Sequence, residues 1–312
     1  MGTPDFAVES LKKMIDYGFN IVAVVSNTDK PAGRGKKILQ SEVTKFAIEN
    51  KLKLFQPPNL KDPEFAEQLS ELNPDLFVVI AFRMLPKVVW EIPKSGTINL
   101  HASLLPQYRG AAPINWAIIN GEKETGVTTF FIDEEIDNGK IIFNKKVAIA
   151  ENDSAGSLHD KLMIAGAELV IKTVLSIIES SNPKIEQSEF SNNEVVLKKA
   201  PKIFKTDCKI NWEKDIHSIQ NFIRGLSPYP AAWTEVVSEN NESISMKIFE
   251  SEMILENHKY NLKTIICDGK NYLKIAVDGG FISIKQLQIA GKRKMKIEEF
   301  LRGFKKNIRI LD

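Results

Sequence analysis

Residues 1–183 alternate between short apolar runs and amphipathic stretches, and this alternation constrains the fold more than any other feature. Apolar residues at helical spacing over 6–17 precede the β-branched run 20–26, and an amphipathic stretch over 62–74 precedes the apolar run 75–82. A continuous apolar run of that length is typical of a strand buried in a parallel sheet. We therefore predict an α/β fold: an open, mostly parallel, Rossmann-like sheet with helices on both faces.

The pattern changes after a long amphipathic helix predicted over 153–180. Residues 184–205 are polar and lack a sustained period, so we interpret them as a linker between a first domain, 1–183, and a second, 206–312. Short strand-like runs separated by Asp-Gly turns fill the second domain after one helix over 212–226. This is typical of a small β-barrel or sandwich.

Composition excludes several classes of protein. The chain is 43% hydrophobic and 26% charged, which is ordinary for a globular protein, and no apolar run reaches the ~20 residues that span a bilayer. Its only cysteines, Cys208 and Cys267, form no CxxC motif, so we expect neither a disulfide framework nor a zinc site, and a cytoplasmic location fits. Basic residues outnumber acidic ones between Lys285 and Arg309, which indicates either a solvated surface or a contact with a polyanion.

Polar side chains stand at the end of the predicted strand 96–101. Asn99 and His101 are two residues apart and so point to one side of the strand, and ligands of open α/β sheets bind at strand carboxyl ends. Asp137 lies in a turn after the next predicted strand. An amide donor, an imidazole and a carboxylate suit acyl transfer to an amine of the substrate. The alternative is a structural histidine and an ordinary Asp-Asn-Gly turn.

A second candidate site is the glycine-rich basic loop 31–37, which carries Arg34, Lys36 and Lys37. Its spacing fits neither a Walker A loop nor a dinucleotide fingerprint. Two interpretations stay open: a charged surface loop, or a contact with a nucleic-acid backbone.

These residues resemble a known family. Asn99, His101 and Ser103–Pro106 match the N-x-H-x-S-L-L-P signature of the 10-formyltetrahydrofolate-dependent formyltransferases, and Asp137 matches their downstream aspartate. Narrower matches indicate the methionyl-tRNA formyltransferases within that family and extend over essentially the whole chain: GTPDFA, DKPAGRGKK, RGAAPINWAI, TGVT and SPYPAAW.

The resemblance implies roles for the matching residues. Asn99, His101 and Asp137 would be catalytic, the first two holding an oxyanion and Asp137 helping to remove a proton from the attacking amine. Ser103, Leu104, Leu105 and Pro106 would contact the folate co-substrate. No metal is expected.

The resemblance also implies the second substrate, a methionyl initiator tRNA. Arg34, Lys36 and Lys37 in the loop would bind it, together with Lys292, Arg293 and Lys294 of an OB-like C-terminal domain. The family suggests a monomer without membrane contact. Two alternatives stay open: a formyltransferase for a small molecule (a sugar amine or glycinamide ribonucleotide), and an RNA-binding protein without activity.

One departure from the family concerns the first strand. The family has a strand before Gly-Thr-Pro-Asp-Phe, whereas here Met1 directly precedes Gly2. We therefore expect the N-terminal sheet to lack that strand, which leaves unpaired backbone groups on its two neighbours. A translation start assigned too far downstream is the simplest explanation, and an upstream extension is expected to improve solubility and activity.

Overall fold

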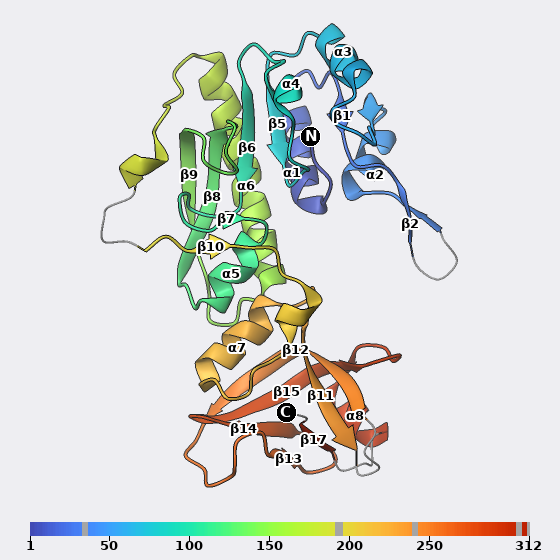
Figure 1. Ribbon diagram of the computed structural model, residues 1–312, viewed down its shortest axis with the longest axis vertical. Coiled ribbons are helices and arrows are strands. Elements are labelled where there is room, and N and C mark those ends of the chain that lie inside the picture. The colour runs from blue at the N-terminus through green and yellow to red at the C-terminus, as the bar shows by residue number, and fades with distance from the viewer. Residues whose placement is uncertain (33–36, 191–195, 239–242, 304–307, 311–312) are drawn as a thin grey trace. The chain divides into compact units, whose positions relative to one another are not determined.

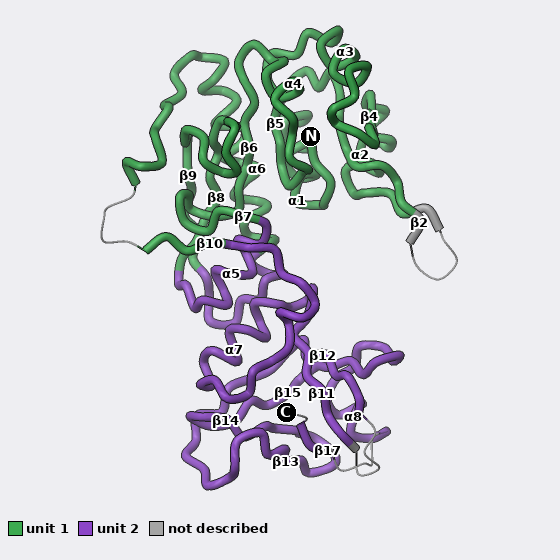
Figure 2. The backbone as a smooth tube through the Cα atoms, in the orientation of Figure 1, with its two compact units in different colours: residues 1–110, 124–148, 159–199 green, residues 111–123, 149–158, 200–312 purple. Residues whose placement is uncertain are grey.

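The structure is a computed structural model that describes residues 1–32, 37–190, 196–238, 243–303 and 308–310. The chain forms two compact units (Figure 2). Unit 1 comprises residues 1–110, 124–148 and 159–199, and unit 2 comprises residues 111–123, 149–158 and 200–312. The domain boundaries expected from sequence, at 183 and 205, stay a prediction, while the contacts group two shorter segments of the first half with unit 2.

Unit 1 is built on two small sheets, and the predicted α/β fold is confirmed. The strand order of the larger sheet is β5-β6-β8-β9, in which β5 and β6 are parallel and β8 and β9 are antiparallel neighbours. In the smaller sheet β1 and β4 are parallel. The larger sheet is mixed because β8 runs antiparallel to both of its neighbours, β6 and β9. The strands are β1 (Val24–Val25), β4 (Leu54–Phe55), β5 (Phe77–Ile80), β6 (Thr97–His101), β8 (Glu124–Phe131) and β9 (Ile141–Ala148).

Helices pack on both faces of these strands, as predicted. On one face α6 (Ala155–Ile178) runs along the larger sheet (Figure 1) and approaches β6 closely. A Cβ on Gly166 would lie 2.7 Å from Leu100, so glycine permits this approach. On the other face an apolar cluster joins β1 and β5 to α3 (Pro63–Glu71) and α4 (Lys87–Trp90). The remaining helices of unit 1 are α1 (Asp5–Asp16) and α2 (Glu42–Glu49), and Ser41 caps the latter by accepting from the Thr44 N–H.

Only Met1 and Gly2 lie between β1 and β5 in the described part of the chain. The Gly2 N–H donates to the Val25 carbonyl at 3.0 Å, and the Ile80 N–H donates to the Met1 carbonyl at 2.9 Å. The Met1 amino group donates to the Val78 carbonyl at 2.7 Å. Two residues thus hydrogen-bond to both strands at the position where the resemblance implies a whole strand.

Unit 2 is an antiparallel sheet packed around one core. The strand order is β13-β14-β15-β12-β11-β17, with β16 pairing β15, and the outer strands β13 and β17 contact one another, so the sheet nearly closes. This is compatible with the predicted OB-like barrel. The strands are β11 (Ala232–Ser238), β12 (Ser243–Leu255), β13 (Ile265–Cys267), β14 (Leu273–Val277), β15 (Gly280–Ile289), β16 (Met295–Lys296) and β17 (Ile308–Ile310).

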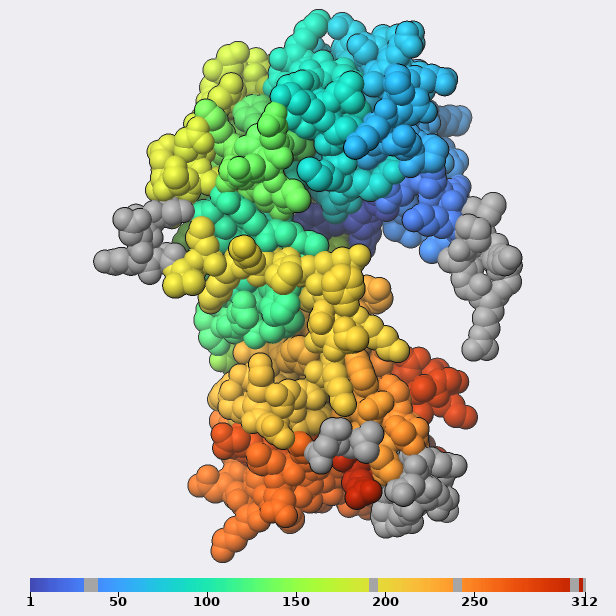
Figure 3. Space-filling model, viewed as in Figure 1, coloured from blue at the N-terminus to red at the C-terminus, as the bar shows by residue number. Residues whose placement is uncertain are grey.

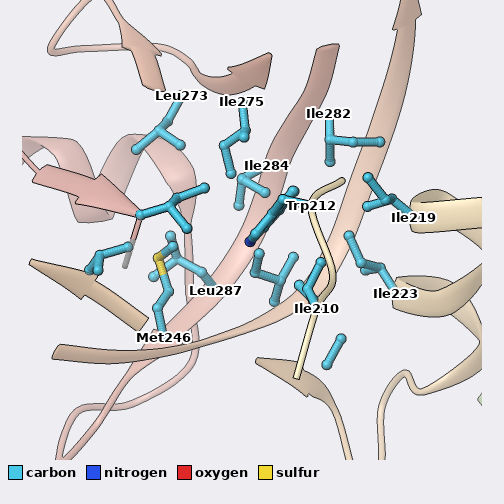
Figure 4. Packing of buried hydrophobic residues seen from close by; sticks show 14 of the residues in the cluster. Ile210, Trp212, Ile219, Ile223, Met246, Leu273, Ile275, Ile282, Ile284 and Leu287 are labelled. Carbon is cyan, nitrogen blue, oxygen red and sulfur yellow. The ribbon is translucent and has the colours of Figure 1, made fainter. Parts of the chain in front are cut away.

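The core of unit 2 lies between the sheet and the helix α7 (Ile216–Gly225). Trp212 sits at its centre among aliphatic side chains (Figure 4), and its indole N–H donates to the Thr234 hydroxyl at 3.0 Å. Ile219 and Ile223, at helical spacing, supply the buried face of α7. A second helix, α8 (Ile297–Gly303), buries Phe300 and Leu301 in the same core.

Unit 2 also contains α5 (Pro113–Ile119), because this helix packs closely on α7. The Asn115 side chain donates to the Gly225 carbonyl at 2.8 Å, and a Cβ on Gly225 would lie 2.7 Å from Ile119. The chain after Ala200 follows α5 on the surface (Figure 3), where the Trp116 indole donates to the Pro201 carbonyl.

The predicted linker contains the 3-10 turn η1 (Gln187–Phe190), which lies in unit 1. It also contains the short strand β10 (Lys199–Ala200), which pairs with β7 (Arg109–Gly110). A second 3-10 turn, η2 (Lys205–Cys208), lies in unit 2. The basic loop is flanked by the hairpin strands β2 (Lys30–Ala32) and β3 (Lys37–Leu39). In the part of the chain that the structure describes, no helix combines the length and apolarity that crossing a bilayer requires.

Candidate active site

Strand β6 places Asn99 and His101 on one face of the larger sheet. They lie opposite Phe130 and Thr128 of β8. The intervening residue, Leu100, points to the other face, where it packs against α6 at Gly166. The alternation of the strand therefore keeps the two polar side chains away from α6.

The ring of His101 is buried and contacts two different groups. Its Nε2 lies 2.9 Å from the Tyr108 carbonyl oxygen, and its Nδ1 lies 3.8 Å from Oδ2 of Asp137. A carbonyl only accepts, so Nε2 carries a hydrogen, and Nδ1 of the neutral ring presents a lone pair to a carboxylate. The Nδ1 of His101 and Oδ2 of Asp137 therefore face one another across 3.8 Å.

Asp137 is held in a tight turn. Its φ is +54°, in the left-handed region that non-glycine residues seldom adopt, and its Oδ2 accepts from the Gly110 N–H at 3.0 Å. Two residues later the turn leaves no room for a side chain, since a Cβ on Gly139 would lie 1.7 Å from the Phe131 carbonyl oxygen. The side chain of Asp137 is 13% exposed, and water screens its charge only weakly.

Asn99 carries a buried side-chain oxygen, Oδ1, with no hydrogen-bond partner among the described residues. An unpaired buried polar atom costs free energy, and a bound ligand is one way to supply the missing partner. Asn99 itself is half-buried, and its amide nitrogen is a donor of the kind that stabilises an oxyanion.

Ser103–Pro106 forms a buried turn fixed by the hydroxyl of Thr128. This hydroxyl donates to the Ser103 carbonyl at 2.6 Å and accepts from the Leu105 N–H at 3.1 Å. Ser103, Leu105 and Pro106 are buried and Leu104 is half-buried. The Ser103 hydroxyl already donates to the Gln107 carbonyl at 2.6 Å. Of the four side chains predicted to contact folate, Leu104 is the one with appreciable exposure.

The structure explains two motifs whose role the residues alone do not indicate. In Thr-Gly-Val-Thr, Thr128 makes the bonds just described, and Gly126 leaves space for Leu104, because a Cβ there would lie 2.5 Å from it. In Tyr-Arg-Gly, Tyr108 adopts φ +60° and presents its carbonyl to His101, while its N–H donates to the Lys198 carbonyl at 2.7 Å.

Gln187 also contacts the turn that carries Asp137, and nothing in the sequence predicts this role. It is 3% exposed, and its amide donates to the carbonyls of Asp137 and Gly139, at 2.9 Å each. Its Oε1 accepts from Nε of Arg109 at 3.0 Å. Gln187 lies in the segment 184–205 that the sequence predicts as a linker.

The predicted tRNA-binding residues lie in both units. Arg34 and Lys36 are outside the described residues, as is the side chain of Lys37. Lys292, Arg293 and Lys294 lie in unit 2, exposed on the turn between β15 and β16. Two of these side chains have local partners: Arg293 pairs with Glu299 at 3.0 Å, and the Lys294 ammonium lies 4.4 Å from the centre of the Phe249 ring.

Comparison with known proteins defines the class. A family described as formyl transferase matches residues 1–174, and one described as the formyl transferase C-terminal domain matches residues 202–305. The chain therefore belongs to the formyltransferase family. Among the residues described, no group of three or more His, Cys, Asp or Glu side chains is placed to hold a metal ion.

Within this family, the chain is similar to proteins that share one name. A protein of Bacteroides thetaiotaomicron named methionyl-tRNA formyltransferase is 53% identical over 307 residues, which is 98% of this chain and 94% of that protein. A protein of Flavobacterium johnsoniae with the same name is 52% identical over 303 residues, covering 97% of this chain and 94% of its own length.

A solved structure shares the fold over nearly the whole chain. The N-formyltransferase of Helicobacter canadensis, in complex with folinic acid and dTDP-3-aminofucose, aligns with a TM-score of 0.64 at 26% identity and covers 94% of this chain and 97% of its own.

Proposed function

We propose that this chain transfers the formyl group of 10-formyltetrahydrofolate to the α-amine of methionine esterified to initiator tRNA. The observation that carries the proposal is the His101–Asp137 pair beside Asn99, in a chain with a relative of 53% identity named for this reaction. A folate co-substrate is supported further by the folinic acid in the similar Helicobacter structure.

The reaction gives each of the polar side chains a role. The amine nitrogen attacks the formyl carbon, a C–N bond forms, and the formyl oxygen takes the negative charge. The Asn99 amide donates to this oxyanion, and the His101 ring stabilises it by charge once it shares the proton taken up beside Asp137. Collapse of the intermediate breaks the bond from the formyl carbon to N10 of the folate.

The proton lost by the amine moves through the His101–Asp137 pair. With Nε2–H held by the Tyr108 carbonyl, a proton accepted by the carboxylate lies between Oδ2 and Nδ1. It then passes to N10 of the departing tetrahydrofolate, so that charge balances over the cycle. Ser103–Pro106 contact the folate beside this pair, with Leu104 the side chain available to do so.

The first experiment measures formylation of charged initiator tRNA with 10-formyltetrahydrofolate as donor. We expect formyl-methionyl-tRNA and tetrahydrofolate in equal amounts. A dTDP-amino sugar and glycinamide ribonucleotide are the competing amines, the former because of the likeness to the Helicobacter enzyme. Faster transfer to either one refutes the tRNA assignment, and tight tRNA binding without folate binding indicates an RNA-binding protein.

Binding of tRNA is proposed for Arg34, Lys36 and Lys37 in the loop and for the basic turn of unit 2. The double variant Lys292→Gln/Lys294→Gln is expected to weaken tRNA binding and to reduce the slope of log affinity against log salt by roughly 1 for each phosphate that is no longer neutralised. The exposed Lys61 of unit 1 gives a control, Lys61→Gln, with an unchanged slope.

The loop has a separate test. Arg34→Ala is expected to lower activity on charged tRNA while folate affinity survives. If folate affinity falls instead, the loop belongs to the folate site and its assignment to tRNA is wrong.

A further inference from the structure

Gln187 forms the centre of a small, fully paired polar network. Both of its donated hydrogen bonds go to backbone carbonyls of the turn that carries Asp137, and its acceptor oxygen receives Nε and a terminal nitrogen of Arg109. Carbonyls only accept and a guanidinium only donates, so the orientation of the amide is fixed by its partners. A buried amide with every partner supplied holds its neighbours in one arrangement.

Arg109 and Gly110 act on opposite ends of the same aspartate. The Gly110 N–H binds the Asp137 carboxylate directly, and the Arg109 side chain acts through Gln187 on the Asp137 carbonyl. Two consecutive residues of β7 thus fix both the side chain and the backbone of Asp137.

The Asp137 turn needs such restraint. A left-handed aspartate costs free energy relative to ordinary backbone, so external contacts must stabilise it. The 3.8 Å separation between Asp137 and His101 is set by the turn, and a shift of about 1 Å in such a group can cost about 100-fold in rate.

We propose that Gln187 and Arg109 are positioning residues that hold Asp137 at its working distance from His101. The inference rests on the proposed function, since it assumes that Asp137 takes part in formyl transfer. The inference gives the linker segment a role in unit 1. It also gives a physical role to Arg109 and Gly110, which motif chemistry alone does not explain.

The main variant is Gln187→Leu, which keeps the volume and removes every hydrogen bond. We expect kcat to fall about 10- to 100-fold, with KM for folate and for charged tRNA changing less than about 2-fold, because only the placement of Asp137 alters. Glu186→Gln is the matched control, because Glu186 directly precedes Gln187. The change removes an exposed ion pair between Glu186 and Lys140 and should leave kcat unchanged.

A double-mutant cycle tests whether the two residues act together. Arg109→Ala and Gln187→Ala should lower kcat by similar factors, and the double variant should be no worse than the poorer single one, since both act through one amide. Factors that multiply would overturn the linked role. Gln187→Asn, which retains a shorter amide, serves where the leucine variant folds poorly, and an unaffected kcat there counts against the proposal.

Hydrogen exchange gives a readout that does not depend on formyl transfer. Amides over 133–140 should exchange faster in Gln187→Leu than in the parent, with the rest of unit 1 unchanged. Faster exchange with normal kcat would overturn the positioning role and leave a structural one. A parent enzyme that formylates another amine would refute the tRNA assignment only, and the cycle would then be measured on that amine.

Discussion

The Gly110 N–H donates at 3.0 Å to Oδ2 of Asp137, the same carboxylate oxygen that lies 3.8 Å from Nδ1 of His101. The backbone contact is the shorter of the two, so the carboxylate is oriented by β7 and not by the histidine. His101 in turn is oriented by the Tyr108 carbonyl. The two ionisable groups are thus placed independently and left facing each other.

Replacing the charge of Asp137 while keeping its shape tests the proton-transfer role. Asp137→Asn retains an oxygen for the Gly110 N–H, so the turn should persist, but the group no longer accepts a proton. We expect kcat to fall roughly 100- to 10,000-fold with little change in folding, measured by formyl transfer and by circular dichroism. Asp133→Asn is the control, since Asp133 is exposed and its side chain accepts from the Glu135 N–H in the same loop. Near-parental activity in Asp137→Asn would remove Asp137 from the mechanism.

Asn99 offers a test in which activity and stability move apart. Asn99→Ala removes the proposed oxyanion donor, which is expected to lower kcat roughly 100- to 1,000-fold. It also removes the buried Oδ1 that lacks a partner, so the free energy of unfolding should not fall by the usual ~1 kcal/mol. Urea unfolding checks the second expectation. Asn144→Ala, on the exposed part of β9 in the same sheet, should leave kcat unchanged.

The sequence is sufficient to predict those parts of the fold that local periodicity determines. The apolar runs and their alternation with helices predicted the α/β unit, and the period of two placed Asn99 and His101 on one side of β6, as the register against Phe130 and Thr128 shows. The Asp-Gly turns between strand-like runs predicted the β-rich second unit.

Long-range polar contacts could not be predicted from the sequence. No periodicity links Gln187 to the Asp137 turn, and a carbonyl such as that of Tyr108 leaves no mark in the residue letters at all. The placement of α5 in unit 2 depends on the absence of a side chain at Gly225, a packing detail between segments far apart in the chain.

Arg224 should be a large contributor to the stability of unit 2. It is 9% exposed, and its guanidinium donates to the carbonyls of Asp153 at 2.8 Å and Ala150 at 3.3 Å. Arg224→Met fills most of the volume but removes the hydrogen bonds to both carbonyls, the one to Asp153 being fully buried, so we expect a loss of roughly 2–4 kcal/mol in the free energy of unfolding. Urea titration followed by tryptophan fluorescence measures it.

The control for Arg224 is a substitution of the same type on the surface. Arg293→Met removes an arginine whose side chain is 74% exposed and should change the free energy of unfolding by about 0.5 kcal/mol or less. Equal losses of unfolding free energy in the two variants would mean that the carbonyl contacts of Arg224 do not add to the stability of unit 2.

The two thiols should differ in reactivity because only one is buried. Burial raises the pKa of the Cys208 thiol above its ordinary 9.0, and its Sγ lies 3.2 Å from the Phe204 carbonyl, whereas Cys267 is exposed. At pH 8 we expect one thiol per chain to react quickly with a disulfide reagent, two after unfolding, and none quickly in Cys267→Ser. The raised pKa also sets the sign of a pH effect: stability from keeping this thiol neutral is complete below about pH 9 and is lost as the pH rises through the folded-state pKa. If Cys208 reacts as fast as Cys267 in the native protein, the core around it opens far more often than its burial implies.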